Sequence, residues 1–189
     1  MATAAPEKVR APSAEAEPRP ADVLVVFGIT GDLAKVMTFR SLYRLESRGL
    51  LDCPIVGVAV DDWTVDQLKE RAKTSIESTG EQLDPKVFER LAERLSYVEG
   101  DFGDAATYER VATAIDGAQQ PVFYLEIPPF LFGRVVQGLA EAGLTANARV
   151  VTSSPQRLPV RRRDPACMRE MMRRRVEPAA CGASIMEAP

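Results

Sequence analysis

The stretch Val23-Leu-Val-Val-Phe27, which runs directly into Gly28-Ile-Thr-Gly31-Asp32-Leu33-Ala34-Lys35, decides the fold of this chain. Five consecutive apolar residues predict a buried strand, and the glycine turn that follows predicts a sharp change of direction into a helix. A turn without Cβ atoms lets the backbone approach an anion, while the first N–H groups and the positive dipole end of the helix point at it. We therefore predict that nucleotide phosphates bind at this turn.

Three details favour a nucleotide site over a turn that needs glycine only for its backbone angles. Thr30 offers a hydroxyl and an N–H beside the phosphate, and Asp32 opens the helix. The small Ala34 allows the helix to pack closely on the strand. The purely conformational interpretation of the glycines remains the alternative.

Composition predicts one soluble domain with a hydrophobic core. The chain has 189 residues, of which 46% are hydrophobic and 27% are charged. It contains no run of the roughly 18 apolar residues that a membrane span needs. Residues 1–20 are rich in Ala, Pro and Glu and have no apolar stretch, so we expect a disordered leader rather than a secretion signal. We predict a cytoplasmic protein without a membrane partner.

The residue types available for chemistry are restricted. The three cysteines (Cys53, Cys167 and Cys181) lack metal-ligand spacing, and the chain has no His, so we expect neither a metal site nor disulfides. The usual proton carrier at neutral pH is also missing. Any general base would have to be Asp, Glu, Lys or Tyr.

Strand and helix patterns alternate along the chain. Strands are predicted at 23–27, 54–60, 95–98, 121–125 and 148–151, and helices at 32–49, 64–78, 84–94, 104–114 and 130–142. In the first helix, the predicted apolar face comprises Leu33, Val36, Met37, Phe39, Leu42, Tyr43, Leu45 and Leu50. This alternation favours an α/β fold of the doubly wound, Rossmann-like type, a parallel sheet with helices on both faces. We assign the dinucleotide-binding domain to residues 21–151.

Residues 152–189 differ in composition and are predicted to form an irregular tail. They hold eight Arg, no Lys and four acidic residues, a net charge of +4, whereas residues 1–151 carry −7. Only a short basic helix near residues 165–175 has any supporting pattern. A disordered tail, a frame-shifted end of a truncated gene, and a nucleic-acid arm are the three interpretations, of which the last is the least favoured.

Acidic residues follow the second strand, where such folds meet the adenosine ribose. A carboxylate at Asp61 would accept a hydrogen bond from a ribose 2′-hydroxyl and repel a 2′-phosphate, which favours NAD over NADP. The alternative is that Asp61-Asp62 only belongs to the capping loop before Thr64. After the third strand, Gly100-Asp-Phe-Gly-Asp104 is better explained as a helix cap than as a border of the adenine.

The fourth strand ends in Glu126-Ile-Pro128-Pro129, which stops strand pairing abruptly. A rigid loop at the carboxyl edge of the sheet would place Tyr124 and Glu126 near a cofactor, because ligands of open α/β folds bind at that edge. A simple strand terminator is the alternative.

Taken together, Phe27–Lys35, Leu50-Leu51, Gly57–Ala59 and Phe123–Pro129 resemble, in order and spacing, the amino-terminal coenzyme domain of glucose-6-phosphate dehydrogenase. The resemblance covers residues 22–151. It implies a Rossmann-like domain that binds NADP or, in some members, NAD. It also implies oxidation of glucose 6-phosphate to the 6-phosphogluconolactone, the first step of the pentose phosphate pathway. The residues implied to surround the coenzyme phosphates are Gly28, Thr30, Gly31, Asp32 and Leu33, and those implied on the nicotinamide side are Tyr124, Pro128 and Pro129.

Several positions depart from the family pattern. Val60 and Met37 stand where NADP-using members carry Arg and Lys, and Ser154 stands at the position of the substrate-binding lysine. The segment with the catalytic His and the large carboxyl-terminal domain have no counterpart. We therefore expect a chain truncated or frame-shifted after about residue 151 that binds NADP or NAD and has no catalytic residue of its own. Glucose 6-phosphate would be a substrate only of a full-length relative.

Two other functions stay open from the residues. An atypical short-chain dehydrogenase or epimerase shares the glycine spacing, but none of the four tyrosines (Tyr43, Tyr97, Tyr108 and Tyr124) has the Lys four residues later that this chemistry requires. A non-catalytic dinucleotide-binding module is the other alternative. The oligomeric state does not follow from the sequence.

Overall fold

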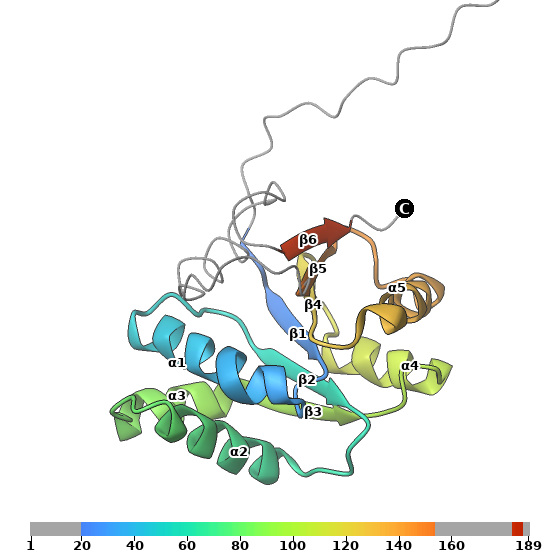
Figure 1. The fold of residues 1–189 in the computed structure, drawn as a ribbon. Helices are drawn as coiled ribbons and strands as arrows, with labels where there is room; N and C mark the ends of the chain where they lie inside the picture. The colour runs from blue at the N-terminus through green and yellow to red at the C-terminus, as the bar shows by residue number, and fades with distance from the viewer. Residues whose placement is uncertain (1–19, 154–182, 187–189) are drawn as a thin grey trace, which may run out of the picture.

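The computed structural model describes residues 20–153 and 183–186 of the chain. These residues form one six-stranded sheet with the strand order β3-β2-β1-β4-β5-β6 (Figure 1). The strands are β1 (Val23–Phe27), β2 (Ile55–Ala59), β3 (Leu95–Glu99), β4 (Pro121–Leu125), β5 (Arg149–Ser153) and β6 (Ala183–Met186). The helices are η1 (Ala34–Thr38), α1 (Phe39–Ser47), α2 (Val65–Ser78), α3 (Pro85–Arg94), α4 (Ala105–Ala114), η2 (Pro129–Leu131) and α5 (Phe132–Glu141).

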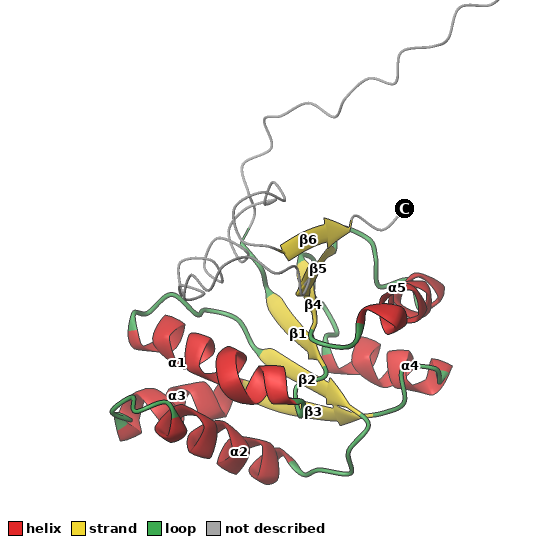
Figure 2. Cartoon of the chain, viewed as in Figure 1, coloured by secondary structure: helices red, strands yellow, loops and turns green. Residues whose placement is uncertain are grey.

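The predicted doubly wound architecture is confirmed. Strands β1 to β5 pair in parallel, and β1 lies between β2 and β4, so the strand order reverses direction at β1. Helices α1, α2 and α3 cover one face of the sheet, and α4 and α5 cover the other (Figure 2). Strands β1, β2 and β4 are buried along their whole length because both of their faces are covered by helices.

Three helices begin where their capping residues predict. Thr64 and Gln67 form a reciprocal capping box at the start of α2. The Asp84 side chain caps α3 with Pro85 in the first turn, and the Asp104 side chain caps α4. Short polar side chains that accept backbone N–H bonds therefore account for these boundaries.

The first helix differs from its predicted pattern. It opens with the π-helical segment η1, closed by a bond from the Phe39 N–H to the Ala34 carbonyl. The wider turn shifts the buried face, so that Ala34 and Thr38 point inward and Val36 is 61% exposed. The predicted placement of Val36 on the apolar face was wrong, whereas Phe39, Leu42, Tyr43 and Leu45 are buried as expected.

The sheet continues beyond the predicted domain boundary. β5 extends to Ser153, and β6, which the tail composition did not predict, pairs antiparallel with it from Ala183 to Met186. Backbone hydrogen bonds to an open sheet edge can recruit a segment that has little strand pattern of its own. The predicted short helix near residues 165–175 lies outside the described residues.

Two glutamates connect α1 to the α2–α3 region. Glu46 accepts hydrogen bonds from Arg90 and Arg94 at 2.8 and 3.0 Å. Glu81 accepts bonds from Arg40 and Arg44, each at 2.8 Å.

Within the described segments, no helix is both long and apolar enough to cross a bilayer.

Candidate nucleotide-binding site

The glycine turn lies at the carboxyl ends of β1 and β4, where the strand order reverses. Gly28 has a φ of +85°, and a Cβ built there would come within 2.5 Å of the Glu126 carbonyl oxygen. The Gly28 N–H donates to the Val58 carbonyl at 2.7 Å, which anchors the turn to β2. Both the backbone angle and the close approach of Glu126, the residue after β4, therefore require glycine at position 28.

The turn presents backbone rather than side chains toward the start of the first helix. The Gly31 N–H donates to the Gly28 carbonyl at 3.0 Å, and the Lys35 N–H donates to the Gly31 carbonyl at 3.1 Å. Asp32 and Leu33 form the first helical turn, whose N–H groups have no partner within the helix. A backbone turn without Cβ atoms, followed by a helix start, fits the pyrophosphate of a dinucleotide.

Ile29 fixes the turn against the neighbouring strand. Its side chain is fully buried and lies over Gly57 of β2, where an added Cβ would come within 2.7 Å of the Ile29 Cγ2 atom. The glycine at position 57 thus makes room for the turn itself. Ala34 is fully buried, as expected for a small residue at the contact between helix and strand.

Asp61 lies beside the turn, as its place after β2 predicts. The Thr30 hydroxyl donates to Asp61 Oδ2 at 2.6 Å, although the two residues are 31 positions apart. The Tyr97 hydroxyl, from β3, donates to the Asp61 carbonyl at 2.5 Å. Burial, together with the nearby carboxylates of Asp61, Glu99 and Asp62, raises the pKa of Tyr97 to about 12.

The residues predicted to lie near the nicotinamide, at the end of β4, differ in their exposure to solvent. Tyr124 is only 8% exposed and belongs to the hydrophobic cluster on the α1 side of the sheet. Pro128 and Pro129 are exposed, and Pro129 begins η2. Between them, Glu126 is 7% exposed and accepts a hydrogen bond from the Thr38 hydroxyl of η1.

Sequence reasoning missed Thr38 and Tyr97. Each lies on an element that is distant in sequence from its partner, and no local motif marks it. Thr38 could have been found only as a polar residue on the buried side of the predicted helix. The predicted apolar face included Val36 in place of Thr38, so this signal was missed. The strand register also places Tyr97 opposite Gly57, but register cannot be read from separate strand patterns.

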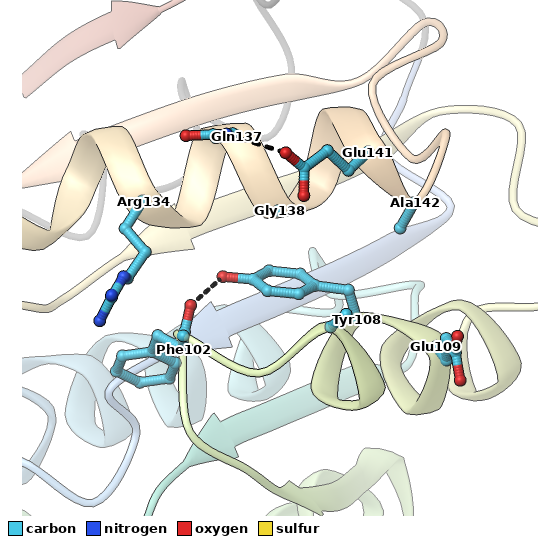
Figure 3. A pocket seen from close by; sticks show the side chains of 10 residues that line it. Phe102, Tyr108, Glu109, Arg134, Gln137, Gly138, Glu141 and Ala142 are labelled. Carbon is cyan, nitrogen blue, oxygen red and sulfur yellow. Dashed lines mark hydrogen bonds between the residues drawn. The ribbon is translucent and has the colours of Figure 1, made fainter.

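A pocket of about 370 Å³ lies between α4 and α5, on the sheet face opposite η1 and α1 (Figure 3). The Tyr108 hydroxyl donates to the Phe102 carbonyl at 2.7 Å, and its ring occupies the space that a side chain at Gly138 would take. Arg134 lies at the end of the pocket near the loop after β3. Burial raises the pKa of Tyr108 to about 12. No pattern in the sequence predicts this pocket.

Among residues 20–153 and 183–186, no group of His, Cys, Asp and Glu side chains is arranged to hold a metal ion. The Asp61 carboxylate bonds Thr30 of the glycine turn, whereas the Glu126 carboxylate bonds Thr38.

Comparison with known proteins identifies the family. Residues 25–156 match the family model described as "Glucose-6-phosphate dehydrogenase, NAD binding domain". Glucose-6-phosphate 1-dehydrogenase 1 of Mycobacterium tuberculosis strain H37Rv is 54% identical over 134 residues, which cover 71% of this chain and 28% of that protein. Glucose-6-phosphate 1-dehydrogenase of Dickeya dadantii is 34% identical over 137 residues, covering 70% of this chain and 28% of that protein.

A solved structure gives the same assignment. The crystal structure of glucose-6-phosphate 1-dehydrogenase from Mycobacterium avium superposes with a TM-score of 0.71 at 54% identity, covering 72% of this chain and 30% of that chain. The chain thus spans less than a third of the length of these relatives. The family model does not favour the short-chain dehydrogenase alternative, and it extends five residues past the boundary predicted at residue 151. This chain belongs to the glucose-6-phosphate dehydrogenase family and corresponds to its amino-terminal NAD-binding domain.

Proposed function

We propose that this chain binds a nicotinamide dinucleotide at the carboxyl ends of β1, β2 and β4. The coenzyme phosphates would lie on Gly28, Thr30, Gly31, Asp32 and Leu33, and the adenosine ribose at Asp61. The nicotinamide half would lie toward Tyr124, Pro128 and Pro129, because each half of a doubly wound sheet takes one mononucleotide. The close approach of Gly28 to the Glu126 carbonyl is the observation that carries the proposal.

For a full-length protein that contains this segment, we propose oxidation of glucose 6-phosphate. The coenzyme would accept the hydride, and a base would have to take the hydroxyl proton of the sugar. This chain has no His, and it spans under a third of its relatives. We therefore propose that the 189-residue chain binds coenzyme without oxidising sugar, in the cytoplasm, where the full-length enzyme would find its sugar phosphate.

Energy transfer from Trp63 provides a direct binding test. Trp63 is the only tryptophan of the chain and lies two residues after Asp61, so a reduced dinucleotide bound at the proposed site would quench its fluorescence. Saturable quenching by NADH or NADPH is expected. Its absence with both coenzymes would refute the proposed function.

Two glycine substitutions, one at the proposed phosphate site and one away from it, provide a test variant and its control. A Cβ at Gly31 would lie 3.1 Å from the Gly28 carbonyl oxygen, so Gly31→Ala should disturb the backbone that faces the phosphates and weaken coenzyme binding about tenfold or more. Gly80, in the turn after α2, has a φ of +74° and open space around it. Gly80→Ala should lower stability while leaving the coenzyme Kd unchanged. Equal effects of the two variants on Kd would contradict the assignment of the phosphate site.

A further inference from the structure

We propose that Asp61, Asp62 and Glu99 make this site selective for NAD over NADP, and that Tyr97 is a positioning residue that holds Asp61 in the selective geometry. The inference rests on the proposed function, because it concerns the adenosine end of the same site.

Asp61 is held by partners from three segments. Thr30 of the glycine turn donates to Oδ2 at 2.6 Å. Tyr97 of β3 and the Trp63 N–H donate to the Asp61 backbone carbonyl at 2.5 and 2.9 Å. Among the described residues, Thr30 is the one side-chain donor to the Asp61 carboxylate, and it bonds Oδ2. The other oxygen, Oδ1, can therefore accept a hydrogen bond from a ribose hydroxyl. Asp61 is thus oriented before a ligand arrives, and preorganised acceptors lower the cost of binding.

The charges at this end of the sheet are negative. Asp61, Asp62 and Glu99 are all exposed, and all three act electrostatically on the Tyr97 hydroxyl. None of the ion pairs found among the described residues involves any of the three. The preceding side chain, Val60, is 59% exposed and uncharged. A 2′-phosphate placed here would meet the three carboxylates, whereas a ribose hydroxyl would meet an acceptor.

Two cations could compete with this assignment. Arg71 of α2 lies over the Trp63 ring, 5.9 Å from its centroid, where it makes a cation–π contact. Arg134 lies on the other face of the sheet. It lines the pocket between α4 and α5, beside Gly103 (Figure 3). Tyr97 packs against the cluster on the α1, α2 and α3 side. Arg134 therefore does not offset the negative charge around Tyr97.

Tyr97 is suited to a positioning role by its place in the sheet. Its strand position is opposite Gly57, over which Ile29 of the glycine turn packs. The phenol reaches past the end of β2 to the Asp61 carbonyl, so it connects β3 to the loop that carries both aspartates. Loss of this hydrogen bond would let the loop that carries Asp61 and Asp62 move, while the charges of Asp61, Asp62 and Glu99 would all remain.

The test is a parallel titration of the full chain with NADH and NADPH, read through Trp63 fluorescence. We expect NADH to bind at least tenfold more tightly. The ratio of the NADPH Kd to the NADH Kd should decrease as KCl rises from about 20 mM to about 500 mM, because salt screens the repulsion between the 2′-phosphate and the carboxylates. Equal or tighter NADPH binding would overturn the inference and leave the proposed function intact. Binding of neither coenzyme would overturn both.

Three variants separate the roles. Asp61→Asn keeps an acceptor for Thr30 but removes a charge, so the Kd ratio should fall severalfold, mainly through tighter NADPH binding. Tyr97→Phe should lower the ratio mainly through weaker NADH binding. Tyr43→Phe is the matched control, because the Tyr43 hydroxyl also bonds backbone groups, at Gln82 and Asp84, but away from this site. It should change stability and leave the ratio unchanged. A ratio unmoved by both Asp61→Asn and Tyr97→Phe would overturn the assignment.

Discussion

The Thr38 hydroxyl donates a hydrogen bond to the Glu126 carboxylate, joining the π-helical start of the first helix to the end of β4 across 88 residues of sequence. Both residues are buried. The backbone of Glu126 forms the wall against which Gly28 packs, and its N–H donates to the Phe27 carbonyl at 2.9 Å. One residue thus contacts the strand before the glycine turn, the turn itself and the helix after it.

We predict that Thr38→Val destabilises the domain by about 1–3 kcal/mol, because it removes the donor to a buried carboxylate while keeping the side-chain shape. Urea unfolding followed by circular dichroism measures the change. Thr113→Val is the control, since the exposed Thr113 hydroxyl bonds only the Glu109 carbonyl of its own helix. That variant should stay within about 0.5 kcal/mol of the parent. Equal costs at the two positions would contradict a special role for the Thr38 bond.

Two glycines with positive φ allow backbone strain to be separated from crowding. Gly49, at φ +62°, ends the first helix and has open space around it, so Gly49→Ala should cost about 1–2 kcal/mol. Gly28 adds the clash with the Glu126 carbonyl, so Gly28→Ala should cost about 1–3 kcal/mol more. Thermal denaturation of the pair gives the difference. Indistinguishable melting temperatures would show that the Glu126 carbonyl does not crowd the turn.

Glu81 is predicted to make stability depend on pH. Hydrogen bonds from Arg44, and then from Arg40, lower the pKa of Glu81 below its ordinary value of 4.5. Because the folded-state pKa is the lower one, the stabilisation is present above the unfolded pKa and is lost as the pH falls through the folded pKa. Glu81→Gln should therefore cost about 1 kcal/mol at pH 7 and nothing below the folded pKa.

Denaturant titrations between pH 7 and pH 3 would follow the difference between Glu81→Gln and the parent. The exposed Glu70 of α2 supplies the comparison, and Glu70→Gln should show no such convergence with falling pH. A constant difference at all pH values would rule out the ion pairs as the source of the Glu81 effect.

Cys53 is predicted to be unreactive in the folded protein. Burial raises the pKa of its thiol to about 11, so about one molecule in a thousand carries the reactive thiolate at pH 8. In a Cys167→Ser, Cys181→Ser background, iodoacetamide labelling followed by mass spectrometry should be slow in buffer and fast in urea. Rapid labelling without denaturant would show that the loop before β2 opens readily.

Local patterns determined much of this domain. The apolar run of β1 and the Gly28–Gly31 stretch predict a strand and a sharp turn, and both lie where the sequence places them, with Gly28 at a positive φ that favours glycine. That the turn binds phosphate stays a prediction. Thr64, Asp84 and Asp104 likewise marked helix starts, because a cap acts on N–H groups only two or three residues away. The predictions failed at the π-helical turn Ala34–Thr38, a local feature that the apolar spacing did not mark, and at strand β6, which pairs with β5 at least 30 positions away in the sequence.

By itself, the sequence determined the family, the alternation of strands and helices, and the position of the glycine turn, because these depend on residue types at short, regular spacings. Only the tertiary structure decided that Thr30 and Tyr97 meet at Asp61, that Thr38 meets Glu126, and that Val36 faces outward. Strand order and register bring together residues that are 31 to 88 positions apart. Pairing between strands depends on the burial of whole faces, which no local pattern encodes.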